Sequence, residues 1–304
     1  MISGKIANHE SNFGPSLATN IQTYVAWTDS DNKIFIAGVE INDNSITIPE
    51  PIYLNIMSPF APSLASYKDY LYIAWTDMDQ KSLHFAKLIT PWFTDNIDLE
   101  QQISVVPRGM MEIMGSPSLF TDYTGFDQNG DPILIQRVTW TDINYYLNLS
   151  PNPPGDYSVL YNTPQSRNTP ANCEGNYISW TDFVYGGLML GKIAPPIGLQ
   201  NLNHLYEVQQ IYSFSFASSA SPALLPVTNI SPGQMESIEI CFRGHGTDTN
   251  LYLTYYPQAP HIQPINLGVS SKSAPSLCSF QDKVILGWTD LNGEINIGTG
   301  LLQF

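Results

Sequence analysis

The sequence predicts an all-β chain that folds over residues 1–304 as a single six-bladed β-propeller, and three observations support this prediction. A proline followed by small and apolar residues occurs six times, at spacings of 47, 55, 53, 52 and 53 residues. A fixed period near fifty residues is typical of a repeat architecture. A Trp-Thr-Asp motif follows five of these prolines and ends at Asp29, Asp77, Asp142, Asp182 and Asp290. The sixth copy is altered to Cys241-Phe242-Arg243-Gly244.

The residues within each period are typical of short β-strands. In the second copy Tyr70–Trp75 is a β-rich run, Asp77–Lys81 is a polar turn, and Leu83–Leu88 alternates apolar and polar residues. No stretch of useful length has helical periodicity. Four short strands per period, repeated six times, predict the blades of a propeller.

The two chain ends are expected to complete one blade together. The last copy ends just after its third strand, Glu294–Thr299, and Ile2–Asn8 precedes the first proline. We expect Ile2–Asn8 to supply the fourth strand of the last blade, with residues 301–304 nearby. This pairing would cover an otherwise exposed strand edge.

The first three copies differ mainly in one insertion. The first copy predicts strands at Thr23–Trp27 and Ile34–Val39 and an outer strand within Ile46–Leu54, and the second copy repeats this order. The third inserts Asp122–Pro132 between its first two strands and has Tyr145–Leu149 as its third.

The last three copies include one compact and one altered blade. Trp180 follows Pro170 by only ten residues in the fourth copy. The fifth inserts Thr228–Glu236 and then reads Arg243-Gly244-His245-Gly246-Thr247-Asp248. The sixth returns to the common pattern, with Asn292-Gly293 as a hairpin turn.

Composition excludes several classes of partner. The net charge is −15, with 12 Lys and Arg against 27 Asp and Glu, which argues against binding to nucleic acid phosphates and to anionic membrane surfaces. No secretory h-region or membrane-spanning run is present. We therefore expect a cytoplasmic protein, or one exported without a classical signal peptide. The three cysteines, Cys173, Cys241 and Cys278, are expected to be buried free thiols.

One face of the predicted disc is the candidate binding surface. In a propeller the innermost strand begins on the same face as the turn between the second and third strands. A serine stands four residues before five of the six prolines, and Ile113 takes its place in the third copy. The Ser-x-x-x-Pro loops and the Trp-Thr-Asp turns are therefore expected to gather on one face.

The repeated tryptophan and aspartate each allow two interpretations. The tryptophan could pack between blades or offer a stacking surface to a sugar ring, and packing is favoured because repeated apolar residues usually mark the core. The aspartate could cap its turn or accept hydrogen bonds from ligand hydroxyls, and capping is favoured. Arg243 and His245 break the repeat, either as a variant turn or as an asymmetric site, and the variant turn is favoured. The candidate ligand-binding residues are Trp27, Asp29, Trp75, Asp77, Trp140, Asp142, Trp180, Asp182, Arg243, Asp248, Trp288 and Asp290.

No pattern for catalysis or metal binding stands out. The sequence has no Gly-x-Ser-x-Gly elbow and no Cys/His pair at suggestive spacing, and its five histidines form no metal motif. We predict no catalytic residue, no metal and no cofactor. A pair of carboxylates contributed by different blades, as glycoside hydrolysis requires, stays open.

The unit Pro62–Leu83 resembles the repeats of bacterial sialidase-like and lectin-like β-propellers, and the resemblance covers essentially the whole chain. In these modules a Trp-Thr-Asp or Arg-Gly-Thr-Asp turn recurs in every blade, and the fifth copy resembles the second variant. The Asp-box of sialidases is missing, and no arginine stands in the sequence context of their carboxylate-binding triad. The resemblance therefore implies a propeller fold and sugar binding in repeated pockets, without catalytic residues.

Three hypotheses for function follow. The first is a multivalent lectin whose weak, near-equivalent blade-loop sites act together on glycans or glycoproteins. The second is a protein-binding scaffold, such as a receptor-binding component of a toxin or effector. The third is a glycoside hydrolase with one axial site. The first is favoured over an enzyme because the unusual features are repeated. The oligomeric state stays open.

Overall fold

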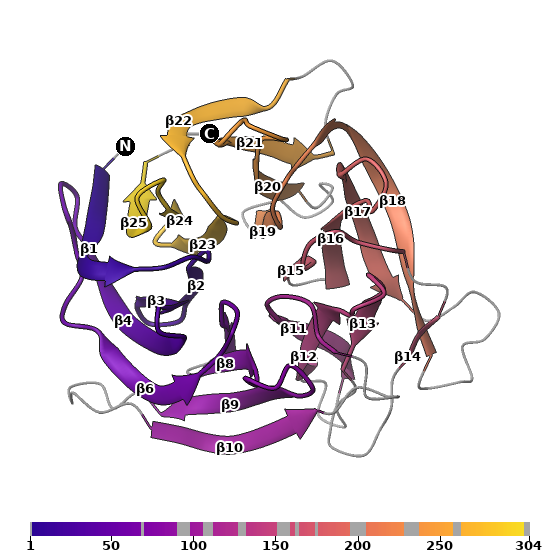
Figure 1. Cartoon of the computed structure of the whole chain (residues 1–304), viewed down its shortest axis with the longest axis horizontal. Coiled ribbons are helices and arrows are strands. Elements are labelled where there is room, and N and C mark those ends of the chain that lie inside the picture. Colours follow the sequence, from indigo (N-terminus) through magenta and orange to yellow (C-terminus); the bar gives the residue numbers. More distant parts are fainter. Residues whose placement is uncertain are drawn as a thin grey trace.

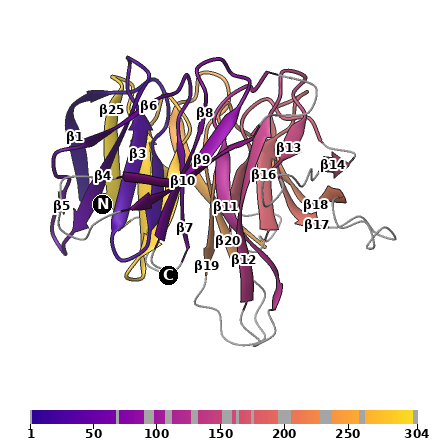
Figure 2. The ribbon, with the colours of Figure 1, turned by 90° about the horizontal axis from the view of Figure 1, so that it is seen from below.

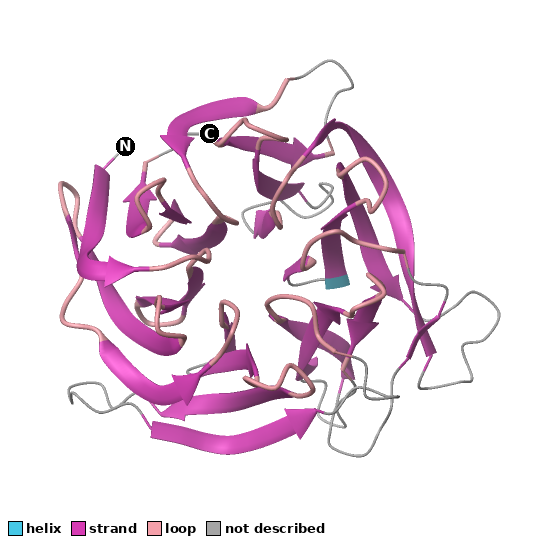
Figure 3. Cartoon of the chain, in the orientation of Figure 1, coloured by secondary structure: helices cyan, strands magenta, loops and turns pink. Residues whose placement is uncertain are grey.

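A computed structural model shows six β-sheets arranged around a central axis (Figure 1). It describes residues 2–67, 70–89, 98–105, 112–126, 132–150, 159–161, 164–173, 176–194, 205–227, 237–257 and 263–300. Strands supply nearly all the regular structure of these residues (Figure 3). The described residues contain no helix long and apolar enough to cross a membrane. The predicted all-β, six-bladed propeller is confirmed.

Blades 1 and 2 follow the predicted order from the axis outward. Blade 1 contains β2 (Ser16–Thr19), β3 (Thr23–Thr28), β4 (Lys33–Ile41) and β6 (Ile52–Met57), and the short β5 (Ile46–Thr47) also pairs with β4. The single outer strand predicted within Ile46–Leu54 is therefore divided in two. Blade 2 contains β7 (Ser63–Tyr67), β8 (Tyr70–Thr76), β9 (Leu83–Ile89) and β10 (Asp98–Val105).

Blade 3 departs most from the common plan. It contains β11 (Ser118–Phe126), β12 (Pro132–Thr141) and the short β13 (Leu147–Leu149). Most of the predicted insertion Asp122–Pro132 lengthens the hairpin, because β11 and β12 pair from Ser118 with Thr139 out to Phe126 with Pro132. Figure 2 shows this hairpin extending past its neighbours on one side of the disc.

The strand β14 (Val159–Tyr161), which follows blade 3 in the chain, joins the sheet of blade 4. This sheet runs β15 (Ala171–Cys173), β16 (Tyr177–Thr181), β17 (Gly187–Ala194) and β18 (Leu205–Ala217), and β14 adds to its outer edge. Because β14 follows blade 3 in the chain, its parallel pairing with β18 links the two blades.

Blades 5 and 6 are regular. Blade 5 contains β19 (Ala223–Val227), β20 (Ser237–Arg243), β21 (Asn250–Tyr256) and β22 (Ile265–Ser270). Blade 6 contains β23 (Ser276–Phe280), β24 (Lys283–Thr289) and β25 (Glu294–Thr299), and its outer strand is β1 (Ile2–Glu10). The antiparallel pairing of β1 with β25 confirms the predicted ring closure. Residues 228–236 and 301–304 lie outside the described part of the chain.

The core is divided among the junctions between blades. Six clusters of buried apolar side chains lie one at each junction, and each contains the tryptophan of the blade that follows in the ring, with Phe242 in its place in blade 5. Trp27, for example, packs against Ile285 and Ile297 of blade 6. Burial of these rings removes a large apolar area from water and holds adjacent blades together.

Candidate functional site

The Ser-x-x-x-Pro loops connect each blade to the turn of the blade before it. The Ser11 amide donates to the Gly293 carbonyl at 2.8 Å, and the Ser58 amide donates to the Asn32 carbonyl at 2.9 Å. Ser218 and Gly186 form the same contact at 2.9 Å. The Ser-x-x-x-Pro loops and the turns between the second and third strands therefore gather on one face of the disc, as expected. We call it the turn face.

The threonine of the repeated motif makes the reciprocal connection to the next blade. Thr28 donates its hydroxyl to the Phe60 carbonyl at 2.7 Å, and Thr141 donates to the Asn168 carbonyl at 3.1 Å. Arg243 occupies this position in blade 5, and its Nε donates to the Ser271 carbonyl at 2.8 Å. The arginine that breaks the repeat thus also contacts the loop of the next blade, but at the carbonyl of the loop serine, whereas the threonines contact the carbonyl two residues later.

The repeated aspartates cap their turns. Asp29 Oδ1 accepts from the amides of Asp31 and Lys33, both at 2.9 Å. Asp290 Oδ1 accepts in the same way from Asn292 at 2.9 Å and Glu294 at 3.0 Å. Such contacts satisfy backbone N–H groups that a tight turn leaves without partners.

The other three aspartates of the motif, together with Asp248, also accept hydrogen bonds in their turns. Asp142 is buried and takes the Asn144 amide at 2.8 Å, and Asp182 takes the Val184 amide at 2.9 Å. Asp248 accepts from the Asn250 amide at 3.0 Å, which is the main reason why its pKa is lowered; the hydroxyl of Tyr252 also contributes. The favoured capping interpretation agrees with all of these contacts.

The five repeated tryptophans are buried. Trp27 is 0% exposed and Trp288, the most accessible of them, is 6% exposed. Their rings face neighbouring blades, in agreement with the packing interpretation. As ligand-binding residues, the twelve candidates named from the sequence stay predictions.

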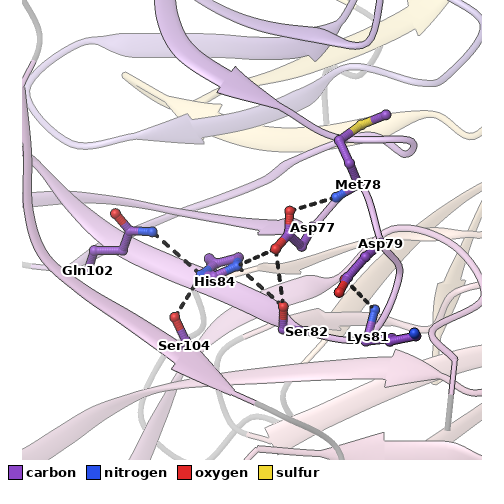
Figure 4. Close-up of polar contacts among 8 residues, drawn as sticks. All are labelled: Asp77, Met78, Asp79, Lys81, Ser82, His84, Gln102 and Ser104. Atoms are coloured by element: carbon purple, nitrogen blue, oxygen red, sulfur yellow. Dashed lines mark hydrogen bonds and ion pairs between the residues drawn. The ribbon is translucent and has the colours of Figure 1, made fainter. Parts of the chain in front are cut away.

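Blade 2 carries a polar cluster around its turn (Figure 4). His84 stacks on Trp75 with ring centroids 5.2 Å apart, and its Nε2 lies 3.4 Å from Asp77 Oδ2. On its other side, His84 Nδ1 lies 2.8 Å from the hydroxyl of Ser104 on the outer strand β10. These residues form a hydrogen-bonded chain across blade 2, and none of them lines the axial cavity described next.

A cavity of about 650 Å³ opens on the axis at the turn face. The residues around the six repeated prolines line it, so every blade contributes one segment. In the first three blades the lining includes Pro15, Pro62 and Pro117 and the serines that follow them. A smaller cavity of about 280 Å³ continues along the axis below it, lined in part by Cys173 and Cys278. All three cysteines are free and buried, as predicted.

Serine side chains join the innermost strands around part of this wall. Ser276 Oγ accepts from the Leu17 amide at 2.9 Å, and Ser16 Oγ accepts from the Leu64 amide at 2.8 Å. Ser63 continues the series with the Leu119 amide at 2.9 Å. Ala171 and Ala223 stand at this serine position in blades 4 and 5, so those blades cannot supply the same hydroxyl.

Two cations are the only charged residues among the described lining of the cavity, Arg167 of blade 4 and Lys272 of blade 6. Both occupy the position directly after the serine of the Ser-x-x-x-Pro loop. Arg167 donates from Nε to the Phe183 carbonyl and from Nη2 to the Val184 carbonyl, the latter at 2.6 Å. Sequence reasoning did not select these two residues, although the other four blades carry uncharged residues at this position, namely Asn12, Pro59, Met114 and Ser219.

Comparisons with known proteins identify structural neighbours only. No model of a protein family and no curated protein sequence matches the chain. The fold is similar to that of Aleuria aurantia lectin in complex with Fucα1-6GlcNAc, with a TM-score of 0.57 and 11% identity over 95% of this chain and 96% of the lectin. It is also similar to Penicillium chrysogenum α-L-arabinanase complexed with arabinobiose, with a TM-score of 0.54 and 9% identity over 98% and 96% of the two chains.

A third neighbour is larger than this chain. A mutant of Trypanosoma rangeli sialidase displaying trans-sialidase activity has a TM-score of 0.54 and 10% identity, covers 99% of this chain, and is itself covered over only 59% of its length. At such low identity these likenesses establish the propeller fold alone.

Proposed function

We propose that this protein binds carbohydrate, and that the ligand occupies the axial cavity of the turn face. The cavity carries this proposal, because its volume of about 650 Å³ lies within the range of roughly 300–1,000 Å³ that is common for small-ligand sites. Its wall combines apolar proline faces with serine, threonine and asparagine side chains. Sugars present both C–H faces and hydroxyl groups, and this mixed wall suits both.

The structural neighbours support a sugar more than another small molecule. Fucα1-6GlcNAc and arabinobiose are bound by the lectin and the arabinanase that share this fold. The described lining contains no Asp or Glu, whereas glycoside hydrolysis ordinarily uses two carboxylates across the scissile bond. Binding without hydrolysis is the function that this wall favours.

The side chains of the turns favour one axial site over six equivalent turn sites. Five turns have a buried tryptophan and an aspartate whose oxygen atoms accept backbone N–H groups. The tryptophan rings and the aspartate carboxylates would have to leave these contacts before they could hold a sugar. A multivalent lectin that uses the turns stays the competing arrangement.

A glycan array followed by calorimetry on the hits tests the proposal. We expect saturation near one sugar per chain. Ser116 lines the cavity and is half-buried, so Ser116→Trp should fill its mouth and weaken binding at least about tenfold. Asp43→Trp is the control, because Asp43 is exposed and lies far from the axis in the loop between β4 and β5.

The outcomes separate the arrangements. Saturation at several sugars per chain that Ser116→Trp leaves unchanged would contradict the axial site and favour binding at the turns. No binding to any glycan would overturn the proposal.

A protein-docking face is the second candidate function, favoured by the apolar residues that the turns expose. Several turns carry them, namely Met78 in blade 2, Ile143 and Tyr146 in blade 3, Val184 and Tyr185 in blade 4, and Leu291 in blade 6. Exposed apolar groups on one face are typical of interaction sites. Capture of one partner that Tyr185→Ser and Leu291→Ser abolish, together with an empty glycan array, would support this function.

A further inference from the structure

The charged residues in the described wall of the axial cavity are both cationic and lie on one side of it. The protein has 12 Lys and Arg against 27 Asp and Glu, yet the charged residues in the described lining of the cavity are Arg167 and Lys272. Both lie on one side of the ring, in the blades on either side of blade 5. Neither forms an ion pair with a described carboxylate.

Arg167 is held in a fixed position. Its Nε and Nη2 donate to the carbonyls of Phe183 and Val184. Two hydrogen bonds to backbone restrict the guanidinium before any ligand arrives, so less side-chain entropy is lost on binding. The nearby carboxylate of Asp182 accepts the amides of Val184 and Tyr185 at 2.9 Å and so is occupied within its own turn.

Lys272 is less constrained. Its ammonium group lies 3.3 Å from the side-chain oxygen of Asn12, an uncharged partner. Between the two cations, blade 5 places Ser219 in the cavity wall, and Arg243 Nη1 donates to its hydroxyl at 2.8 Å. The Ser219 hydroxyl in turn donates to the Gly244 carbonyl at 2.6 Å. The side of the cavity formed by blades 4 to 6 therefore carries two cations without anionic partners among the described residues.

An exposed aromatic residue follows one of the two residues that hold Arg167. Tyr185 follows Val184, which holds the guanidinium, and Tyr185 is 79% exposed. A tyrosine ring exposed in this way can stack on a sugar ring.

From these features we propose that the ligand of the axial cavity is a carboxylate-bearing saccharide, whose acid group binds Arg167 with support from Lys272. This inference rests on the proposed carbohydrate function and specifies its substrate class. Guanidinium groups form short, charge-assisted hydrogen bonds with carboxylates, often two at once. A neutral sugar would leave this preorganised cation without an anionic partner.

The experiment compares acidic saccharides with their methyl esters by calorimetry. The probes are an oligogalacturonate, a glucuronate-containing oligosaccharide and sialyllactose, which distinguish uronic acids from other sugar acids. Esterification removes the charge and leaves the sugar and its linkage unchanged. For at least one probe we expect the free acid to bind at least about tenfold more tightly than its ester, and to lose affinity as salt is raised.

Three variants locate the charge effect. Arg167→Gln should remove most of the preference for acid over ester, and Lys272→Gln should reduce it. Lys33→Gln makes the same change of charge in the turn of blade 1, outside the cavity lining, and should leave the preference unchanged. Thermal unfolding of each variant verifies that it is folded.

The outcomes distinguish this inference from the proposed function. Equal affinity for acids and esters, with binding still blocked by Ser116→Trp, would overturn the acidic ligand and keep the carbohydrate site. An acid preference that Arg167→Gln leaves intact would also overturn it. Absence of binding to every saccharide would overturn both.

Discussion

Arg243 breaks the repeat and still connects its blade to the loop of the next blade. It stands where other blades have threonine, and it reaches the Ser271 carbonyl of blade 6 at 2.8 Å through Nε. Its Nη1 also reaches Ser219 at 2.8 Å, on the side of blade 5 toward blade 4. One side chain thus contacts the loops on both sides of blade 5.

We therefore expect Arg243→Ala to lower the free energy of unfolding by about 1–3 kcal/mol, because it removes two hydrogen bonds of a charged donor. Urea unfolding followed by tryptophan fluorescence measures this. Arg243→Thr restores a hydroxyl at the repeat position and should recover part of the loss. An alanine variant as stable as the parent would mean that these contacts are not needed at this junction.

Glu239 is a buried acid that makes the stability of the protein depend on pH. Its side chain is 1% exposed on β20, and its Oε2 has no hydrogen-bond partner among the described residues. Burial raises the pKa of this carboxyl to about 7. The folded protein therefore keeps the proton that the unfolded chain releases near pH 4.5, so the protein loses stability as the pH rises between these two values.

Glu239→Gln should remove this dependence, because the amide stays neutral. Near pH 5 the parent and the variant should have similar free energies of unfolding. At pH 8 the variant should be more stable by about 2 kcal/mol, since the parent then carries a buried charge. Urea titrations at the two pH values measure the difference. A constant difference across this range would contradict the prediction.

At the scale of residues, sequence reasoning succeeded where the determinant is local. Asp29 and Asp290 cap turns that their own neighbours form, and an aspartate at a hairpin predicts such a cap. Arg167 and Lys272 were not selected, because whether a loop residue lines the axis depends on segments from all six blades. The acidic composition of the chain also gives no sign of a local basic region.

At the scale of elements, the loop before β2 has no room for a side chain. A Cβ added to Gly14 would lie 2.0 Å from the Ala274 carbonyl oxygen of the last blade. Gly14 therefore allows the first and last blades to approach each other where the ring closes.

Gly14→Ala should destabilise the protein by about 1–3 kcal/mol, because backbone atoms must move apart to admit the methyl group. Differential scanning calorimetry would show the lower Tm. The matched control is Gly38→Ala on β4, where the added Cβ meets only the end of the Gln22 side chain at 3.1 Å. Equal Tm values for the two variants would contradict a specific constraint at the closure.

Inner strands were predicted better than outer strands. The strand predicted at Thr23–Trp27 is β3, which extends one residue further, to Thr28, and β-rich residues with a buried tryptophan mark it clearly. The edge strands are less regular: β5 and β6 share one predicted segment, and β14 pairs with blade 4. Such pairing depends on a partner distant in sequence, so local periodicity cannot reveal it.

At the scale of the whole molecule, the ring distributes its core among six junctions, so each blade depends on both neighbours. Five junctions join blades consecutive in the chain, while the sixth joins the last blade to the first. Thr289 donates to the Phe13 carbonyl at 2.6 Å across this closure, and Leu17 donates to Ser276 at 2.9 Å. Strand β1 completes the outer edge of the last blade.

Deletion of residues 2–10 should therefore weaken the entire ring. It removes the pairing of β1 with β25 and the buried side chain of Ile6, which packs in the cluster between blades 6 and 1. We expect a loss of more than about 3 kcal/mol in the free energy of unfolding, since burial of one such side chain contributes about 1.5–3 kcal/mol before the strand pairing is counted. The exposed edge of β25 should also promote association between chains, visible by size-exclusion chromatography.

A synthetic peptide of residues 2–10 added to the truncated protein should restore both the stability and the elution volume of the parent, whereas a peptide of the same composition in scrambled order should not. The point variant Ile6→Ala tests the packing separately and should cost about 2–5 kcal/mol with the strand retained. If the truncated protein unfolded at the same urea concentration as the parent, closure by β1 would contribute little. The stability of the ring would then reside in the junctions between consecutive blades.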